Sequence, residues 1–237
     1  MGKKIDELSI VIPCYNEQRL LIESMRTIEE YCKANVKKYE IIVVDDCSTD
    51  YTAIILKNNF KDFIVLRNEI NMGKGYSVKK GMLRAKYKWV LFTDADLSTP
   101  ITEIEKLLQY QSYDIIIGTR NAPGSDRKVN QPFYRVLAGK IFPIVVNMLM
   151  GWNYTDTQCG FKLFNKRCIK TIFNKQTIHR FAFDVELLYI GKLHKFITKE
   201  VPIVWENSSE SKVKLIRDSL QMFGEIMAIK KNHGKLK

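Results

Sequence analysis

The sequence contains no long uninterrupted hydrophobic run. Its longest apolar stretch, residues 141–152, includes Pro143 and Asn147 and falls well short of the roughly 20 residues that a membrane-spanning helix needs. The first seven residues are rich in charge, and Pro13 interrupts the short apolar run that follows them, so no signal peptide is evident. We therefore expect that the chain does not cross a membrane.

Cysteine and histidine pair motifs are also missing. The five cysteines are odd in number and none stands in a CxxC pair, so the pattern suggests neither a disulfide framework nor a thiolate zinc site. His179 and His194 have no partner at the spacing of metal ligands. This composition favours a reducing, cytoplasmic setting.

Two common nucleotide-binding motifs do not occur. There is no GxGxxG fingerprint and no GxxxxGK[ST] loop, which argues against a P-loop nucleotidase. A shorter glycine motif, Gly73-Lys74-Gly75, lies between a predicted strand and a predicted helix. Such a motif lets the backbone come close to a ligand and supplies a cation, so Gly73 and Lys74 are candidates for binding a phosphorylated donor.

The charge is strongly unbalanced towards the basic side. The net charge of +12 calls for an acidic partner, which is a nucleic acid, an anionic lipid or a phosphorylated substrate. The excess is concentrated in the second half, where residues 212–237 hold seven Lys or Arg against two acids. A nucleic-acid-binding module is the main non-enzyme alternative. We disfavour it, because acidic clusters in the first half would repel a phosphate backbone.

The pattern of apolar segments predicts one α/β domain. With 237 residues, 46% of them hydrophobic, the chain can bury one substantial core. Strand-like and helix-like segments alternate through the first half, as a mostly parallel, Rossmann-like sheet flanked by helices requires. We expect a catalytic domain over 1–211, with a loop of the lid type at 119–135, and a basic amphipathic C-terminal helix and tail over 212–237. The predicted strands are 8–12, 39–44, 63–67, 89–93 and 114–118, and the predicted helices are 17–34, 52–59 and 76–86.

Polar clusters follow three of the predicted strands. The sequence from Pro13 to Glu17 follows the first strand, Asp45 and Asp46 end the second, and Asp94-Ala95-Asp96 ends the fourth. Ligands of open parallel sheets collect at the carboxyl ends of strands, so these clusters predict a site. A polar turn or a helix cap would explain any one cluster alone.

Asp94 and Asp96 are candidate metal ligands. Because one residue separates them just beyond a strand, both carboxylates can turn towards one hard cation, Mg²⁺ or Mn²⁺. Such an ion would bridge the phosphates of a nucleotide sugar and neutralise charge on the leaving diphosphate. In the same site Asp46 could accept hydrogen bonds from a nucleobase, Tyr15 could stack on it, and Glu17 could bind a ribose hydroxyl.

Several longer motifs are spread over nearly the whole chain. They are VIPCYNE from Val11, VVDDCSTD from Val43, NMGKGYSVKKG from Asn71, DADLSTP from Asp94, GTR ending at Arg120, RVLAGK from Arg135, DTQCGFKLF from Asp156, RFAFDVELLYI from Arg180 and SKV from Ser211. These motifs resemble family 2 of the glycosyltransferases. Within that family the second half is most similar to the branch that transfers glucose to dolichyl or polyprenyl phosphate. The resemblance therefore implies a GT-A fold, UDP-glucose as donor and a polyprenyl phosphate as acceptor.

The resemblance assigns roles to the matching positions. It implies a nucleoside pocket, a metal site whose third position is Ser98 where mannosyl relatives carry Gln, and two arginines that meet phosphate. It also places Asp156 as a base or, with equal weight, as a helix cap or a group that orients Arg135. The implied set is Pro13, Tyr15, Glu17 and Asp46 for the nucleoside, Asp94, Asp96 and Ser98 for the metal, Arg120 and Arg135 for phosphate, and Gln158, Ser211 and Lys212 for the acceptor.

The expected reaction is an inverting transfer of a hexose to a lipid phosphate at the cytoplasmic face of a membrane. A mannosyl transfer from GDP-mannose, or a transfer that builds another glycan, remains the alternative, because a carboxylate can accept hydrogen bonds from uracil or guanine. We expect peripheral docking through the basic C-terminal helix and through 141–152. The alternative for that helix is an ordinary helix that packs on the core and has a solvated basic edge. A homo-oligomer is possible. The apolar positions of that helix at spacings of three and four are Val213, Ile216, Leu220, Phe223 and Met227.

Overall fold

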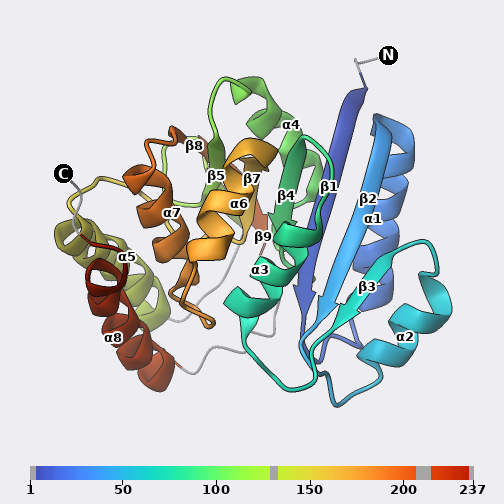
Figure 1. Cartoon of the computed structure of the whole chain (residues 1–237), viewed down its shortest axis with the longest axis horizontal. Helices are drawn as coiled ribbons and strands as arrows, with labels where there is room; N and C mark the ends of the chain where they lie inside the picture. The colour runs from blue at the N-terminus through green and yellow to red at the C-terminus, as the bar shows by residue number, and fades with distance from the viewer. Residues whose placement is uncertain (1–3, 129–132, 207–214, 235–237) are drawn as a thin grey trace.

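A seven-stranded sheet covered by helices on both faces forms the core of a single domain (Figure 1). The computed structural model describes residues 4–128, 133–206 and 215–234. The strand order is β3-β2-β1-β4-β7-β5-β8, in which β7 runs antiparallel to both neighbours and every other pairing is parallel. The strands are β1 (Ile5–Cys14), β2 (Val36–Asp45), β3 (Ile64–Arg67), β4 (Trp89–Thr93), β5 (Ile115–Thr119), β7 (Phe161–Asn165) and β8 (Thr198–Pro202).

Each face of the sheet has its own hydrophobic core. On one face Val11 and Phe92 pack with α3, α6, α7 and α8, and on the other Ile10 and Ile12 pack with α1, α2 and α4. The strands read as continuous apolar runs because a parallel sheet is buried on both sides. The helices are α1 (Leu21–Asn35), α2 (Thr52–Asn59), α3 (Lys74–Arg84), α4 (Ile104–Leu107) between the 3₁₀ turns Ile101–Glu103 and Leu108–Tyr110, α5 (Phe133–Met150), α6 (Lys166–Lys175), α7 (Phe183–Leu193) and α8 (Leu215–His233).

The antiparallel strand β7 determines where the functional segments meet. It pairs with β4 so that Phe161, its first residue, lies opposite Thr93, the last residue of β4. The segment that leads into β7 therefore reaches the same edge of the sheet as the segments that leave β4 and β5. Three stretches far apart in the sequence, 94–98, 119–120 and 155–160, come together there.

Part of the expected loop at 119–135 is regular structure instead. It contains β6 (Asp126–Lys128), and α5 begins at Phe133. The short strand forms because it pairs in parallel with β9 (Val204–Glu206), with Asp126 opposite Val204. Sequence periodicity cannot detect a pairing between segments so far apart, and residues 129–132 lie outside the described part of the chain.

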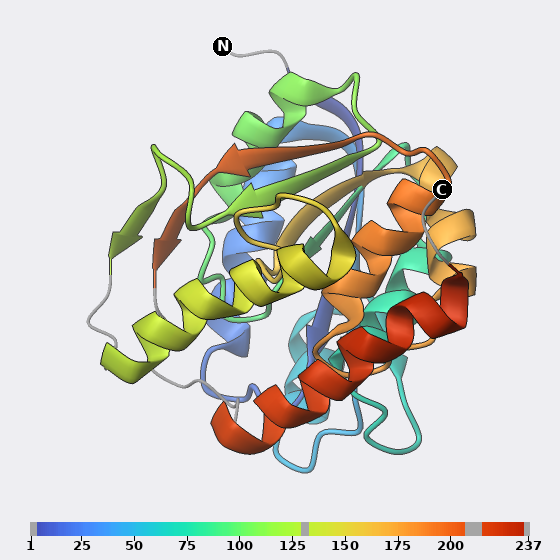
Figure 2. The same ribbon diagram turned by 90° about the vertical axis from the view of Figure 1, so that its left-hand side faces the viewer.

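The C-terminal helix α8 is part of the domain. It contacts α5 and α7, and the two long helices α5 and α8 lie side by side (Figure 2). Among its described side chains, from Gln221 onwards, α8 buries Met222, Ile226 and Ile229, whereas Phe223 and Met227 from the predicted apolar face are 49% and 54% exposed. The other residues of that face, Val213, Ile216 and Leu220, have side chains outside the described part of the chain. The predicted domain boundary after 211 falls outside the described residues. Among the described residues, no helix is both long enough and apolar enough to span a bilayer.

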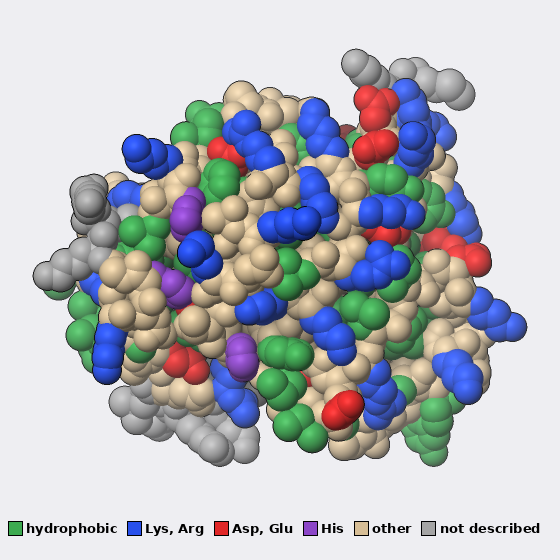
Figure 3. Space-filling model, viewed as in Figure 1, with side chains coloured by type: hydrophobic (Ala, Val, Ile, Leu, Met, Phe, Trp, Pro, Cys, Tyr) green, Lys and Arg blue, Asp and Glu red, His purple; other side chains and the backbone are tan. Residues whose placement is uncertain are grey.

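Basic side chains are spread widely over the surface. Figure 3 shows Lys and Arg distributed across the face that carries α3 and α6, with few acidic side chains between them. This face therefore shows no single basic stripe of the kind that follows a nucleic-acid backbone.

Candidate active site

The two DxD carboxylates lie at the carboxyl end of β4 and are held differently. The Asp94 Oδ1 atom lies 2.6 Å from the ammonium of Lys74, the first residue of α3. The Asp96 Oδ1 atom accepts a hydrogen bond of 2.9 Å from the backbone N–H of Ser98. That bond turns the chain back on itself after β4, so both acids stay at the edge of the sheet.

These residues fit a divalent cation that a ligand helps to bind. Carboxylate oxygens are the donors that Mg²⁺ and Mn²⁺ prefer. In the described part of the chain, no group of three or more His, Cys, Asp or Glu side chains is arranged to hold a metal ion. Asp94 and Asp96 alone leave most of an octahedral shell to other oxygens, such as those of a diphosphate and water.

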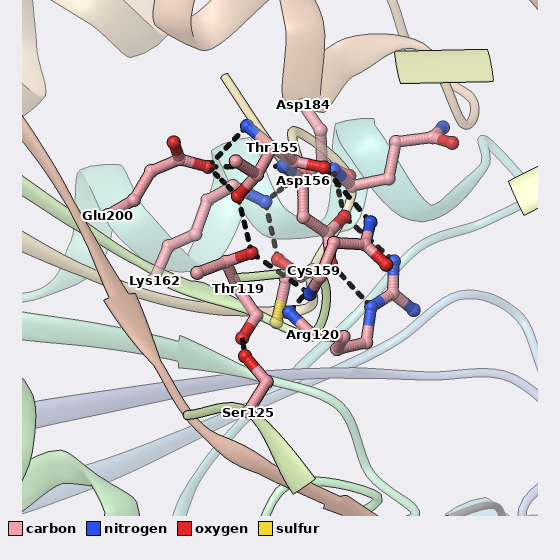
Figure 4. Close-up of polar contacts among 11 residues, drawn as sticks. Thr119, Arg120, Ser125, Thr155, Asp156, Cys159, Lys162, Asp184 and Glu200 are labelled. Carbon is pink, nitrogen blue, oxygen red and sulfur yellow. Dashed lines mark hydrogen bonds and ion pairs between the residues drawn. The ribbon is translucent and has the colours of Figure 1, made fainter. Parts of the chain in front are cut away.

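Several contacts hold the side chain of Arg120 in place. It follows β5, and its Nε and Nη2 atoms donate to Oδ2 and Oδ1 of Asp156 at 2.6 and 2.9 Å (Figure 4). The backbone N–H of Arg120 adds a third bond to Asp156. The ring of Trp205, on β9, lies against the guanidinium, with 5.4 Å from Cζ to its centroid. Bidentate pairing and stacking hold the planar guanidinium in one orientation.

This pairing changes the protonation of Asp156. Burial would raise the pKa of the carboxyl, but the charge of Arg120 and its hydrogen bonds outweigh burial and lower the pKa below its ordinary value. Asp156 is therefore a carboxylate with both oxygens engaged. These contacts favour the alternative in which Asp156 orients an arginine over the one in which it acts as a base. The arginine that it contacts is Arg120, whereas the expected one is Arg135, whose side chain lies outside the described part of the chain.

A second layer of polar contacts fixes the segment around Asp156. The Oε1 atom of Glu200, on β8, accepts hydrogen bonds from the backbone N–H groups of Thr155 and Asp156 at 2.8 and 3.1 Å. The hydroxyls of Thr155 and Thr119 are 2.7 Å apart. Figure 4 shows these groups converging from β5, β8 and the segment before β7.

A buried ion pair between β7 and α7 stabilises the segment that leads into the site. Lys162 is fully buried on β7 and donates to Asp184 and to the backbone oxygen of Cys159. Burial raises the pKa of the Asp184 carboxyl, and the charges of Lys162 and Lys74 oppose that effect. Asp184 thus contributes to the structure of the site through its ion pair with Lys162.

Comparison with known proteins assigns the family. The family model described as "Glycosyl transferase family 2" matches residues 9–173, which is more than half of the chain. This chain belongs to glycosyl transferase family 2. It is an enzyme, a glycosyltransferase, as the sequence resemblance predicts.

Similar proteins with curated names cover nearly the whole glycosyltransferase. A dolichyl-phosphate beta-glucosyltransferase of Trichomonas vaginalis is 33% identical over 223 residues, which is 88% of this chain and 68% of that protein. The Dictyostelium discoideum protein of the same name is 32% identical over 240 residues, 94% of this chain and 73% of its own length. The human one is 31% identical over 242 residues, with 94% and 75% covered.

Solved structures confirm the GT-A type of fold. Mannosyl-3-phosphoglycerate synthase from Rubrobacter xylanophilus superimposes with a TM-score of 0.71 at 15% identity, covering 98% of this chain and 77% of that one. Glucosyl-3-phosphoglycerate synthase from Mycobacterium tuberculosis, solved with Mn²⁺, UDP-glucose and glycerol 3-phosphate, gives a TM-score of 0.68 at 15% identity, with 100% and 82% covered.

The two acids that end β2 differ in their contacts. Asp46, expected to meet the nucleobase, accepts hydrogen bonds from the backbone N–H groups of Met72 and Gly73, both at 2.8 Å, and from the Asn68 amide at 2.7 Å. It therefore holds the 71–75 loop of this glycosyltransferase, and its contact with a base stays a prediction. In Asp45, by contrast, the Oδ2 atom is buried and accepts no hydrogen bond from any described residue, with Arg67 Nη1 3.4 Å away.

The remaining expected residues are only partly placed. Around β1 of the glycosyltransferase, Pro13 is buried, Tyr15 is exposed, and the backbone N–H of Glu17 donates to the Thr52 hydroxyl. Gln158 follows Asp156, and its amide points towards the Phe181 carbonyl at 3.5 Å. Arg135 lies in α5, but its side chain is outside the described part, and so are Ser211 and Lys212 entirely.

Sequence reasoning missed several residues that complete the site. Lys162, Glu200, Thr119 and Thr155 act through contacts with segments 22 to 45 residues away in the sequence. One signal was available for Lys162, because a lysine at the start of an apolar strand has to find a counter-charge when it is buried. No comparable signal marks Glu200.

Proposed function

We propose that this glycosyltransferase moves glucose from UDP-glucose to the phosphate of a dolichyl or other polyprenyl lipid. The observation that carries the proposal is the similarity to dolichyl-phosphate beta-glucosyltransferases, which extends over 94% of the chain in several of them. That span includes both the DxD segment and the segment around Asp156, so the donor and acceptor halves of the site support the same activity.

The chemistry follows from the charges at the sheet edge. Asp94 and Asp96 would hold Mg²⁺ or Mn²⁺, which supplies positive charge to the leaving diphosphate when bound. Lys74 adds a cation beside them, and Arg120, fixed by Asp156, adds a second near the transferred group. Positive charge aimed at developing negative charge is the main source of rate enhancement in such a site.

The acceptor needs to be oriented more than it needs to be deprotonated. A phosphate oxygen of the lipid is already an anion near neutral pH and attacks the anomeric carbon. The bond from that carbon to the diphosphate oxygen breaks as the new bond to the lipid phosphate forms, UDP leaves, and the configuration inverts. No proton has to move, and this agrees with an Asp156 that is ionised and engaged with Arg120.

The nucleobase has a candidate partner in Asp45. Its buried Oδ2 atom forms an ion pair with Arg67 Nη1 at 3.4 Å but accepts no hydrogen bond from a described residue, so it can still accept one from a ligand. Either the N–H of uracil or that of guanine would satisfy it. The identity of the nucleobase, uracil, is therefore inferred from the similar proteins and not from Asp45 Oδ2.

The lipid acceptor also implies docking on a membrane surface. Both α5 and α8 expose apolar side chains, namely Ile144 and Met148 on α5 and Phe223 and Met227 on α8. Exposed Lys230 and Lys231 follow on α8. We propose that these helices meet the cytoplasmic face of an anionic membrane, with apolar insertion and basic attraction acting together.

A donor panel tests the activity directly. The purified chain is incubated with a short polyprenyl phosphate, Mn²⁺ and UDP-glucose, GDP-mannose or UDP-galactose in parallel, and lipid products are identified by mass spectrometry. We expect a polyprenyl phosphate hexose from UDP-glucose. A product only from GDP-mannose would establish mannosyl transfer, and no lipid product with any donor would contradict the acceptor class.

A further inference from the structure

The ammonium of Lys74 contacts Asp94, one of the two carboxylates that would hold the metal ion. Its Nζ atom is 2.6 Å from Asp94 Oδ1, and it also lies 5.4 Å from the ring centroid of Phe92. At this distance the ammonium of Lys74 takes up a lone pair of Asp94 Oδ1. A metal ion that bound the same lone pair would have to displace Lys74.

The backbone that carries Lys74 has little freedom to move. Asp46 accepts hydrogen bonds from the two N–H groups immediately before it, those of Met72 and Gly73. A Cβ atom on Gly73, whose φ is 96°, would lie 2.6 Å from the His179 carbonyl oxygen, and one on Gly75 would lie 2.7 Å from Cβ of Phe183. The loop is therefore pressed against residues 178–183 on both sides of Lys74.

The carboxylate of Asp94 is confined as well. A Cβ atom on Gly160 would lie only 2.0 Å from Asp94 Oδ2, so the backbone before β7 closes that side. With Oδ2 against Gly160 and Oδ1 against Lys74, the carboxylate cannot rotate freely away from the ammonium. The contact is thus imposed by two rigid segments and is not a chance surface pair.

The charges around Asp94 indicate which ligand would separate Lys74 from Asp94. Asp94, Asp96 and Lys74 together carry −1, and the nearby Asp156 and Asp184 are each neutralised, by Arg120 and Lys162. A divalent cation alone would change the sum to +1 and place two cations side by side. A diphosphate, with about three negative charges, reverses that sign and offers Lys74 a new partner.

We propose that Lys74 competes with the divalent cation for Asp94, so that metal binds tightly only together with the donor diphosphate, which takes over the Lys74 ammonium. The proposal rests on the proposed role of Asp94 and Asp96 in holding the metal. It makes metal and nucleotide binding mutually dependent, and by linkage each raises the affinity for the other by the same factor.

Mn²⁺ titrations followed by electron paramagnetic resonance test this without measuring turnover. The wild type, Lys74→Met, Lys74→Arg and the exposed-charge control Lys57→Met are titrated with and without saturating UDP. In the absence of UDP, Lys74→Met should bind Mn²⁺ about tenfold more tightly than the wild type, whereas Lys74→Arg and Lys57→Met should not. With UDP present, Lys74→Met should lose most of the increase in Mn²⁺ affinity that the wild type shows.

The outcomes separate this inference from the metal site itself. A Lys74 that only supports the fold would lower Mn²⁺ and UDP affinity together in Lys74→Met, and that result would overturn the competition. A wild type that binds Mn²⁺ equally well with and without UDP would also overturn it, even if Lys74→Met failed to fold. If no variant binds Mn²⁺ even with UDP, the metal-dependent part of the proposed function fails with it.

Discussion

Arg120 and Asp156 form a two-pronged ion pair that joins β5 to the segment before β7. Its two bonds measure 2.6 and 2.9 Å, and Trp205 covers the guanidinium from β9. Because both carboxylate oxygens are engaged, the pair is neutral overall and holds the guanidinium of Arg120 in a fixed direction. This explains how a site can orient a phosphate without a general base.

The first prediction concerns the coupling of this pair. Asp156→Asn and Arg120→Met should each lower kcat/KM by roughly 10²-fold, since the first removes the carboxylate that orients the guanidinium and the second removes the guanidinium itself. The double variant should be hardly slower than either single one, because residues that act as a unit are non-additive. Steady-state kinetics of the four proteins give the coupling.

The pH dependence of the same four proteins separates orientation from base catalysis. If Asp156 were the base, Arg120→Met would shift an acidic limb of the kcat profile upward, since the carboxyl would lose the cation that lowers its pKa. Fully additive losses together with such a shifted limb would contradict the orienting role.

The second prediction is a stability difference that depends on pH. The folded state lowers the pKa of Asp156 below the ordinary value of 3.8, so its contribution is complete above that value and is lost as pH falls through the folded pKa. Asp156→Asn should therefore unfold more easily than the wild type by about 3 kcal/mol at pH 7 and by clearly less near pH 3.

Urea unfolding at several pH values measures that difference. The raised pKa of Asp184 acts equally in both proteins and cancels when they are compared. A gap between wild type and Asp156→Asn that stayed constant down to pH 3 would show that Asp156 gains nothing from Arg120.

The third prediction concerns the DxD carboxylates. Asp96→Ala should lower turnover by at least roughly 10²-fold while the fold survives, because the residue would hold a charge-stabilising cation and lies at the edge of the sheet rather than in the core. Activity of the wild type should vanish with excess EDTA and return with Mn²⁺ or Mg²⁺. Circular dichroism controls for folding, and full activity in EDTA would refute metal dependence.

Sequence alone predicts the parallel part of this fold well. The strand at 89–93 and the helix at 52–59 coincide with β4 and α2, since buried apolar runs and helical periodicity are local signals. Because the strands and helices alternate as predicted, the acids after β2 and β4 lie at the carboxyl ends of those strands, as expected. The antiparallel insertion of β7, which brings Gly160 against Asp94 and Asp156 against Arg120, depends on pairings between distant segments and leaves no periodic trace.

The C-terminal helix shows a different limit. The spacing of Phe223 and Met227 correctly indicates an apolar face, but the core of the molecule uses a neighbouring face that includes Met222, Ile226 and Ile229. A helical pattern of apolar residues shows which faces of a helix are apolar, but it does not show which of those faces packs on the core. That the face with Phe223 and Met227 points outward is therefore known only from the packing.

The last prediction is that this outward face binds anionic membranes. Met227 is 54% exposed on α8, and Met148 on the adjacent α5 is 79% exposed. Burying such side chains in the interface is favourable by about 1.5–3 kcal/mol each, and each nearby Lys adds about 1 kcal/mol on an anionic surface. Phe223→Glu combined with Met227→Glu should therefore weaken binding to phosphatidylserine liposomes at least about tenfold.

The control is Ile54→Glu. Ile54 is 54% exposed, as is Met227, but it lies on α2, at the opposite end of the molecule in Figure 1. Co-sedimentation at low and high salt measures both terms, since salt screens the lysines and leaves the apolar insertion. A loss of binding free energy per added Glu that is the same in the α8 variant and in Ile54→Glu would show that binding follows total charge and not this face.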